Sequence, residues 1–285
     1  ECCATLQDFE RFLDTLSRPI KVEANFAVID AQGGAAYYET NNQTYIKADA
    51  NDPNQAPHGY LIRSNFSYSG RIDEGMGYIR HETAVQLFSK ERAKAKLTPE
   101  WMFSSVDRSY YHSLLGIDLK NYDFNALGAT GFAIDQDFIP RFTTSASIVF
   151  QGVKEGELPE HTTMWTALGF PSCSVAMPLW VIGGDKLPSL LVKGSRSENA
   201  PLCEKAVTLK YRVFPIKRGS GAKYCSWSAL YNPHNTGIMQ LVAPVEKDIF
   251  KRTYTVMQQW GDGSWNPASI QRFYAEINAV VEKAY

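Results

Sequence analysis

The order in which helical and strand-like patterns follow one another is the feature that most constrains the fold of this 285-residue chain. A helical pattern comes first, then strands, helices, a second series of strands from about residue 142, and closing helices. Helices and strands that come in runs are typical of layers built on antiparallel sheets. The order therefore predicts an α+β fold. We find no internal repeat and no convincing linker, and we predict a single domain over residues 1–285.

The chain opens on the pattern of a capped helix. Thr5 has the character of an N-cap, and Asp8, three residues on, is its return partner in a capping box. Apolar residues spaced by three and four positions then predict an amphipathic helix over residues 6–17, which Pro19 ends.

The remaining elements are predicted from the same kinds of signal. Strand patterns, rich in β-branched and aromatic residues and bounded by turn residues, cover residues 24–40 (two strands joined by a turn), 43–50, 58–67, 143–153, 162–171 and 173–182. Helical patterns cover residues 77–94, a segment from Thr98-Pro99 to about Leu115, residues 246–260, and a segment that begins at Asn266-Pro267.

Composition excludes several classes of partner. The formal net charge of -1 gives no general attraction to nucleic acid or anionic lipid, and no apolar stretch reaches the roughly 18 residues needed to span a membrane. We therefore expect no nucleic-acid partner and no membrane span. The first residues resemble neither a natural N-terminus, which would begin with Met, nor a signal peptide. We interpret them as a boundary left by cleavage or truncation.

Cysteine and histidine usage gives no metal or cofactor signature. The five cysteines are odd in number and lack CxxC spacing, and the five histidines include no HExxH motif. A structural zinc site and a disulfide framework are therefore not expected, although one disulfide among the later cysteines stays open. Residues 219–223 (GSGAK) resemble a fragment of a phosphate-binding loop but lack its length, and we interpret them as a turn. We expect no cofactor and no metal.

A set of ordered segments carries a resemblance to a known class. These are a C-x-T-hydrophobic start at residues 3–6, a D-x-x-G-x-A turn at residues 30–35, Glu39 at a strand end, a strand ending in Ser-Asn at 58–67, and an R-x-x-x-A-x-x-L helix at 78–88. In these segments, and more loosely over residues 143–180, the chain resembles N-terminal-nucleophile amidohydrolases that cleave linear amides. Within that class it resembles choloylglycine hydrolases, penicillin V acylases and acyl-coenzyme A:6-aminopenicillanic acid acyltransferases.

The resemblance implies a fold and a mechanism. The fold is an αββα sandwich of two antiparallel sheets flanked by helices, of which this chain would be the C-terminal portion. In the mechanism, the thiol of a residue-1 cysteine attacks an amide carbonyl, its own α-amine takes the proton, and the resulting acyl-enzyme is hydrolysed. The substrate would be a small molecule with an amide bond.

The resemblance also assigns two candidate catalytic residues. Asn65 matches the strand-end asparagine, whose side-chain amide would donate to the oxyanion. Arg80 matches the helix-start arginine, whose charge would favour the thiolate. The residues alone allow plainer roles: Asn65 could end a strand by bonding nearby backbone, and Arg80 could be a solvated arginine paired with Glu74 or Glu82. We interpret His81 and Glu82 as exposed helix residues.

The adjacent Cys2 and Cys3 are not expected to be the nucleophile. In the class, that residue begins a strand far upstream of the helix that starts here, whereas Cys3 occupies a packing position ahead of the Thr5 cap. We therefore expect the nucleophile outside this chain, and no amidase activity from the chain alone. Sheet edges left open in such a fragment are prone to association. We expect a missing N-terminal segment, a second chain or a homo-oligomer to cover them.

Three other functions stay open. The strands at residues 162–180 also resemble those of cysteine dipeptidases, which would make the substrate a peptide. The chain could instead be a non-catalytic ligand-binding or interaction protein on the same scaffold. An aromatic-rich sugar-binding module would need aromatic side chains lining an exposed groove, whereas we expect Trp165, Trp180, Trp227 and Tyr231 to be buried.

Overall fold

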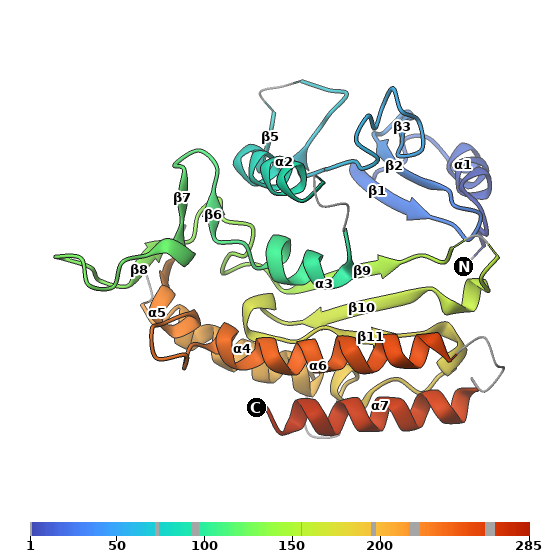
Figure 1. Cartoon of the computed structure of the whole chain (residues 1–285). Coiled ribbons are helices and arrows are strands. Elements are labelled where there is room, and N and C mark those ends of the chain that lie inside the picture. The colour runs from blue at the N-terminus through green and yellow to red at the C-terminus, as the bar shows by residue number, and fades with distance from the viewer. Residues whose placement is uncertain are drawn as a thin grey trace. The chain divides into compact units, whose positions relative to one another are not determined.

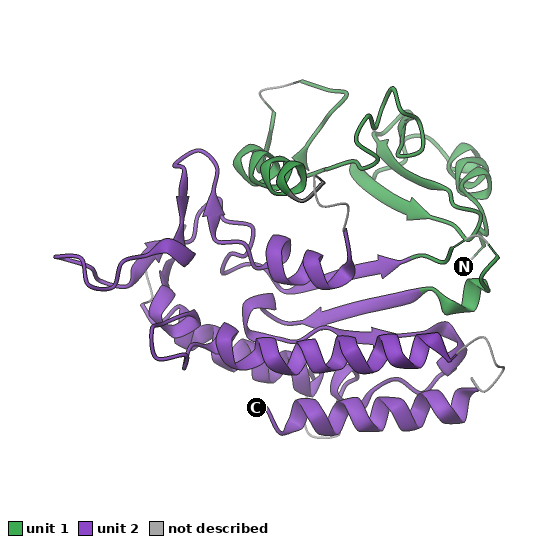
Figure 2. Ribbon diagram, viewed as in Figure 1, with its two compact units in different colours: residues 1–94, 152–162 green, residues 95–151, 163–285 purple. Residues whose placement is uncertain are grey.

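The computed structural model describes residues 2–71, 74–92, 97–154, 156–194, 198–216, 223–259 and 266–285. The chain divides into two units, drawn in different colours in Figure 2. Unit 1 comprises residues 1–94 and 152–162, and unit 2 comprises residues 95–151 and 163–285. Both contain helices and antiparallel strands, which confirms the α+β prediction. That the chain is one domain stays a prediction.

Unit 1 is built on a three-stranded antiparallel sheet and the helix that precedes it (Figure 1). The sheet has the order β1-β2-β3, with strands β1 (Ala24–Ile29), β2 (Ala35–Thr40) and β3 (Tyr45–Asp49). Helix α1 (Leu6–Thr15) has the predicted capping box: the Asp8 amide donates to Thr5 Oγ1 over 3.1 Å, and the Thr5 amide donates to Asp8 Oδ2 over 3.0 Å. The helix ends two residues earlier than predicted.

The two faces of this sheet have different neighbours. Successive side chains of a strand point to opposite faces. On β2, Ala36 and Tyr38 form a buried cluster with Leu6 and Leu13 of α1. Glu39 alternates with them, so it lies on the face opposite α1. Any residue attached to α1 is therefore separated by the sheet from a site built around Glu39.

The second half of unit 1 holds a short hairpin and a helix. Strands β4 (Asn65–Phe66) and β5 (Gly75–Met76) pair antiparallel, and helix α2 (Tyr78–Arg92) follows as predicted. The strand predicted over residues 58–67 is wrong except for β4. Its apolar side chains pack without a strand partner, as in the 5.0 Å ring contact between Tyr60 and Phe88.

Unit 2 packs long helices and a second sheet together. The sheet has the order β11-β10-β9, with strands β9 (Ala146–Gln151), β10 (Thr163–Leu168) and β11 (Met177–Leu179). All three fall within predicted strand segments. The main helices are α4 (Pro201–Val213), α6 (Ile238–Gln258) and α7 (Pro267–Glu282), and α6 and α7 lie side by side (Figure 1). Helix α6 begins eight residues before the predicted start: its N-cap is Gly237, whose amide donates to Gln240 Oε1 over 3.1 Å.

The core of unit 2 is rich in aromatic rings. Trp165 stacks on Phe250 with ring centroids 4.2 Å apart, and Trp180 lies parallel to Tyr274 at 5.9 Å. Trp165, Trp180 and Trp227 are all buried, as predicted. The same prediction is wrong for Tyr231, which is 39% exposed and stacks on Trp227 with ring centroids 5.7 Å apart. These tryptophans therefore do not form the exposed platform that a sugar-binding module would need.

Short elements complete the fold. The short strands of unit 2 form two pairs: β6 (Tyr111–His112) with β7 (Ile117–Asp118), and β8 (Phe132–Ile134) with β12 (Tyr224–Ser226). Helix α5 (Trp227–Leu230) follows β12. Single 3₁₀ turns are η2 (Leu119–Asn121), η3 (Pro159–His161), η4 (Pro171–Cys173), η5 (Val181–Gly183) and η6 (Ser189–Leu191). Across the described ranges, no helix has both the length and the apolar character needed to cross a membrane.

The helix predicted from Thr98 to about Leu115 is wrong at its end. Thr98 caps helix α3 (Pro99–Trp101) as predicted, but the helix continues as a wider π-helix, η1 (Met102–Asp107), and then stops. Arg108 leaves the helical conformation with φ -111° and ψ 25°. Its guanidinium instead donates to the backbone carbonyls of Pro171 and Ser174. Long-range hydrogen bonds of a buried arginine therefore override the local helical pattern.

Asp107, at the end of this π-helix, makes stability depend on pH. Burial raises the pKa of its carboxyl to about 6, although the hydrogen bond from Ser147 and the charge of Arg108 act in the opposite direction. The folded protein thus holds this proton more tightly than the unfolded chain, whose aspartates titrate near pH 3.9. The favourable contribution of protonated Asp107 is present below about pH 4 and is lost as the pH rises through about 6.

We expect Asp107→Asn to stabilise the protein by about 1–3 kcal/mol at pH 8 relative to the wild type, with a much smaller gain at pH 4. The neutral amide keeps an acceptor for Ser147 and removes the cost of the buried charge. Urea unfolding at both pH values measures the difference. Asp185→Asn, at an exposed position, is the control. Equal effects of Asp107→Asn at the two pH values would contradict this assignment.

Candidate functional site

A groove in unit 1 contains the asparagine singled out from the sequence. It has a volume of about 890 Å³ and lies on the sheet face opposite α1. A row of three side chains across the sheet, Asn25, Glu39 and Ile46, contributes to it, since Glu39 pairs in register with both of the others. Residues of the β4–β5 hairpin supply the other wall: Ser64, Asn65, Phe66, Ser67, Ser69, Gly70, Glu74 and Gly75. We call this the Asn65 groove.

Asn65 and Arg80 contact each other directly. Asn65 begins β4, and Arg80 lies in the first turn of α2. Arg80 Nη2 donates a hydrogen bond to Asn65 Oδ1 over 2.7 Å. A guanidinium has only donors, so the atom it contacts must be the amide oxygen. The side-chain NH₂ of Asn65, which is exposed, is then the end left to donate to another molecule.

Gly77 and Ser64 allow this contact to form. Ser64 Oγ accepts from the Asn65 amide over 2.7 Å and donates to the Gly77 carbonyl oxygen over 2.8 Å. Gly77 has a φ of +87°, and a Cβ there would lie 2.4 Å from Arg80 Nη2. A side chain at this position would therefore displace the guanidinium from Asn65. The positive φ of residue 77 also favours glycine.

Glu39 anchors the loop that borders the groove. Its carboxylate accepts hydrogen bonds from the Tyr68 amide over 3.0 Å, from the Ser69 amide and hydroxyl over 3.3 and 2.9 Å, and from the Ser67 hydroxyl. Burial alone would raise the pKa of Glu39, but the hydrogen bonds from Ser67 and Ser69 outweigh it and hold the pKa below its ordinary value. A carboxylate so fully engaged is a structural anchor and not a base.

An aromatic stack lies beside the groove. The Phe66 ring stacks between Tyr68 at 4.3 Å and Tyr78 at 4.4 Å, with His81 edge-on at 5.4 Å. Burial lowers the pKa of His81. The expectation that His81 is an exposed helix residue is therefore wrong, because the stack covers its ring. Glu82 is exposed as expected.

The sequence also left open that Arg80 pairs with Glu74 or Glu82. Each of these acids has a contact with another residue. Glu74 forms an ion pair with Arg71 over 3.1 Å. Glu82 accepts from Gln86 over 3.0 Å. Arg80 contacts Asn65, and this contact joins the two residues that the sequence singled out.

None of the cysteine thiols, all of which the structure describes, lines the Asn65 groove. Cys3 lies just ahead of α1, and partial burial together with Cys2 raises the pKa of its thiol. Because α1 packs on the opposite face of the sheet, Cys3 belongs to the other side of unit 1. In unit 2, burial raises the pKa of Cys173 to about 12 and that of Cys225 further. All five cysteines are free thiols.

Within the described ranges, no cluster of three or more histidine, cysteine, aspartate or glutamate side chains has the geometry to hold a metal ion. The predicted turn at residues 219–223 falls mostly outside the described residues. Comparisons of the chain with protein-family models, curated proteins and solved structures found no match. The chemistry of the site therefore has to be argued from the groove itself.

Proposed function

We propose that this chain provides the oxyanion-binding part of an N-terminal-nucleophile amidohydrolase that cleaves a linear amide C–N bond in a small acylated molecule. The observation that carries the proposal is the hydrogen bond from Arg80 to Asn65 Oδ1. It orients the asparagine amide so that its NH₂ is free to donate at the edge of a substrate-sized groove. A fixed donor of this kind stabilises the negative oxygen of a tetrahedral intermediate.

In the proposed reaction a cysteine thiol, deprotonated by its own α-amine, attacks the amide carbonyl carbon. The carbonyl oxygen becomes an oxyanion that accepts from Asn65, and the α-amine of the same cysteine takes the thiol proton and passes it to the leaving amine. Water then attacks the thioester and releases the acid and the thiol. Attack by a second amine in place of water would make the same site an acyltransferase.

We place the nucleophile outside residues 1–285, because no cysteine of this chain lines the groove. Cys173 and Cys225 are buried, and Cys3 lies on the side of the sheet that α1 covers. An edge strand with exposed apolar side chains supports a covering segment. In unit 2, Ile148 and Phe150 share one face of the edge strand β9 and are 46% and 58% exposed. Within the proposal, the αββα sandwich is completed by the strand that carries the nucleophile.

The test is an assay of the protein expressed from its natural gene. The panel should contain penicillin V, glycine- and taurine-conjugated bile acids, N-acyl homoserine lactones, N-acyl amino acids and dipeptides. We expect release of the free amine from at least one acylated compound, and a cysteine-bound acyl adduct detectable by mass spectrometry. Hydrolysis of dipeptides alone would favour the dipeptidase alternative. The absence of any turnover and any adduct would contradict the proposal.

Arg80 offers a second test, as a positioning residue. We expect Arg80→Ala to lower kcat by about 10–100-fold with little change in KM, because the Asn65 amide would lose the partner that fixes its orientation. Arg80→Gln, which can still donate, should lose less. The control is Arg71→Ala, an exposed arginine paired with Glu74. Equal losses in the two alanine variants, or an equal fall in thermal stability and activity, would contradict this role.

A further inference from the structure

Arg63 is a cation held between two aromatic rings. Its guanidinium carbon lies 4.1 Å from the Tyr68 ring centroid and 5.3 Å from that of Tyr37. Tyr37 projects from β2 on the same sheet face as Glu39, and Tyr68 belongs to the loop that Glu39 anchors. Contacts of this kind fix the plane of a guanidinium and leave its edge to bind an acceptor.

The Arg63 charge has no counter-ion in the part of the chain that the structure describes. Nη1 donates to the carbonyl oxygen of Ile62 over 3.0 Å, and Nε is buried without a hydrogen-bond partner. The Tyr68 hydroxyl is also buried without a partner of normal geometry. A half-buried guanidinium with unused donors is costly. Such groups in native proteins usually have a function or a missing ligand.

A pocket of about 240 Å³ lies at this point. Arg63, Tyr37 and Tyr68 line it, and it shares Glu39, Ile46 and Ser69 with the Asn65 groove, so the two adjoin. We call the smaller one the Arg63 pocket.

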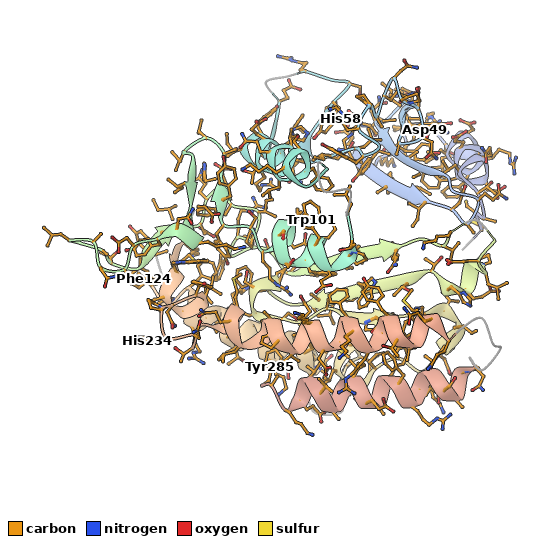
Figure 3. The ribbon with its side chains drawn as sticks, in the orientation of Figure 1. Asp49, His58, Trp101, Phe124, His234 and Tyr285 are labelled. Carbon is orange, nitrogen blue, oxygen red and sulfur yellow. The ribbon has the colours of Figure 1, made fainter. Side chains whose placement is uncertain are left out.

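The other charged residues that line the Arg63 pocket, Lys47 and Glu39, already have partners. Lys47 forms ion pairs with Glu10 over 3.0 Å and with Asp49, labelled in Figure 3, over 3.2 Å. Glu39 is saturated by the donors of residues 67–69. Among the described residues that line this pocket, the charge of Arg63 is therefore the one available to a ligand. Burial raises the pKa of Tyr68 to about 12, so its hydroxyl stays protonated and able to donate.

We infer that the Arg63 pocket binds a carboxylate of the substrate, so that the enzyme acts on N-acyl amino acids or on other acylated amines that carry a carboxylate. The inference rests on the proposed function only for the reaction at the neighbouring groove. A planar carboxylate matches the fork of donors on a guanidinium. The two sites together would hold the acid group and the scissile amide of one molecule.

The experiment compares a matched pair of probes, N-phenylacetylglycine and its neutral amide N-phenylacetylglycinamide. Calorimetry measures their binding to the protein expressed from its natural gene. We expect the acid to bind about 10–100-fold more tightly than the amide. Arg63→Gln should abolish this preference, and Arg63→Lys, which keeps the charge, should retain part of it. Arg11→Gln removes an exposed arginine of α1 and should leave the preference unchanged.

The outcomes separate this inference from the proposed function. Equal binding of acid and amide to the wild type, or a preference that survives in Arg63→Gln, overturns the carboxylate site. If Arg63→Gln fails to fold by circular dichroism, the Arg63→Lys variant and the wild-type probe pair decide. An acid preference without turnover of any amide overturns the proposed function and supports the site. Turnover with equal kcat/KM for the two probes overturns the site alone.

Discussion

Replacing Glu246 with alanine should destabilise the protein by about 3–5 kcal/mol, because the change strands a buried cation. Arg108 and Glu246 are each 5% exposed. They form a bidentate pair in which both nitrogen–oxygen distances are 2.6 Å. Glu246 Oε2 also accepts from the Ala176 amide over 2.7 Å. Without the carboxylate, the guanidinium would lose its counter-ion and this backbone amide would lose its acceptor.

Urea unfolding followed by tryptophan fluorescence measures the loss. Asp248→Ala is the matched control on the same helix, since it breaks the exposed pair with Arg252 and should cost at most about 1 kcal/mol. The double variant Arg108→Met/Glu246→Leu should recover most of the stability, because buried ion pairs are often replaceable by apolar pairs. A loss in Glu246→Ala no larger than that in Asp248→Ala would show that the buried pair does not stabilise the fold.

Elements with local signals were predictable. The capping box of Thr5 and Asp8 starts α1, and Asn266 with Pro267 starts α7, in each case through hydrogen bonds between residues at most three positions apart. Helix α4, which is not among the predicted helices, also has a local signal. Pro201 at its first position and the buried Leu202, Ala206 and Val213, spaced by four and seven residues, form a helical pattern.

Elements decided by distant contacts were not predictable. The helix after Thr98 stops where Arg108 turns to Glu246, which lies 138 residues away in sequence. The strand predicted over residues 58–67 failed because Arg63, in its middle, lies between Tyr37 and Tyr68 and not in a ladder. The local propensity of a segment carries no information on such distant partners as Glu246 for Arg108 or Tyr37 for Arg63.

The candidate site was likewise predictable in part. The resemblance selected Asn65 and Arg80 one by one, but their contact depends on the positive φ of Gly77 and on the Ser64 hydroxyl, which only the structure shows. Arg63 carried one signal in the sequence, a charge in the middle of an apolar run. Its significance depends on the lack of a counter-ion among the described residues, which is a property of the folded chain.

Replacing Asn65 with alanine should lower kcat for amide hydrolysis by about 10²–10³-fold, a loss of about 2.7–4 kcal/mol in transition-state stabilisation. KM should change little, because the oxyanion that Asn65 binds exists only after attack on the carbonyl. Asn65→Asp should be at least as damaging, since its carboxylate would repel the oxyanion and pair with Arg80. The control is Asn54→Ala, an exposed turn residue of the same unit, which should retain activity.

A double variant distinguishes a shared role of Asn65 and Arg80 from two separate ones. If Arg80 acts by orienting the Asn65 amide, it has nothing to orient once that amide is gone. Asn65→Ala/Arg80→Ala should then be no slower than Asn65→Ala alone. Losses that multiply would mean that Arg80 stabilises the thiolate or the substrate directly. Retention of more than about a third of wild-type kcat in a folded Asn65→Ala variant would remove Asn65 from the oxyanion role altogether.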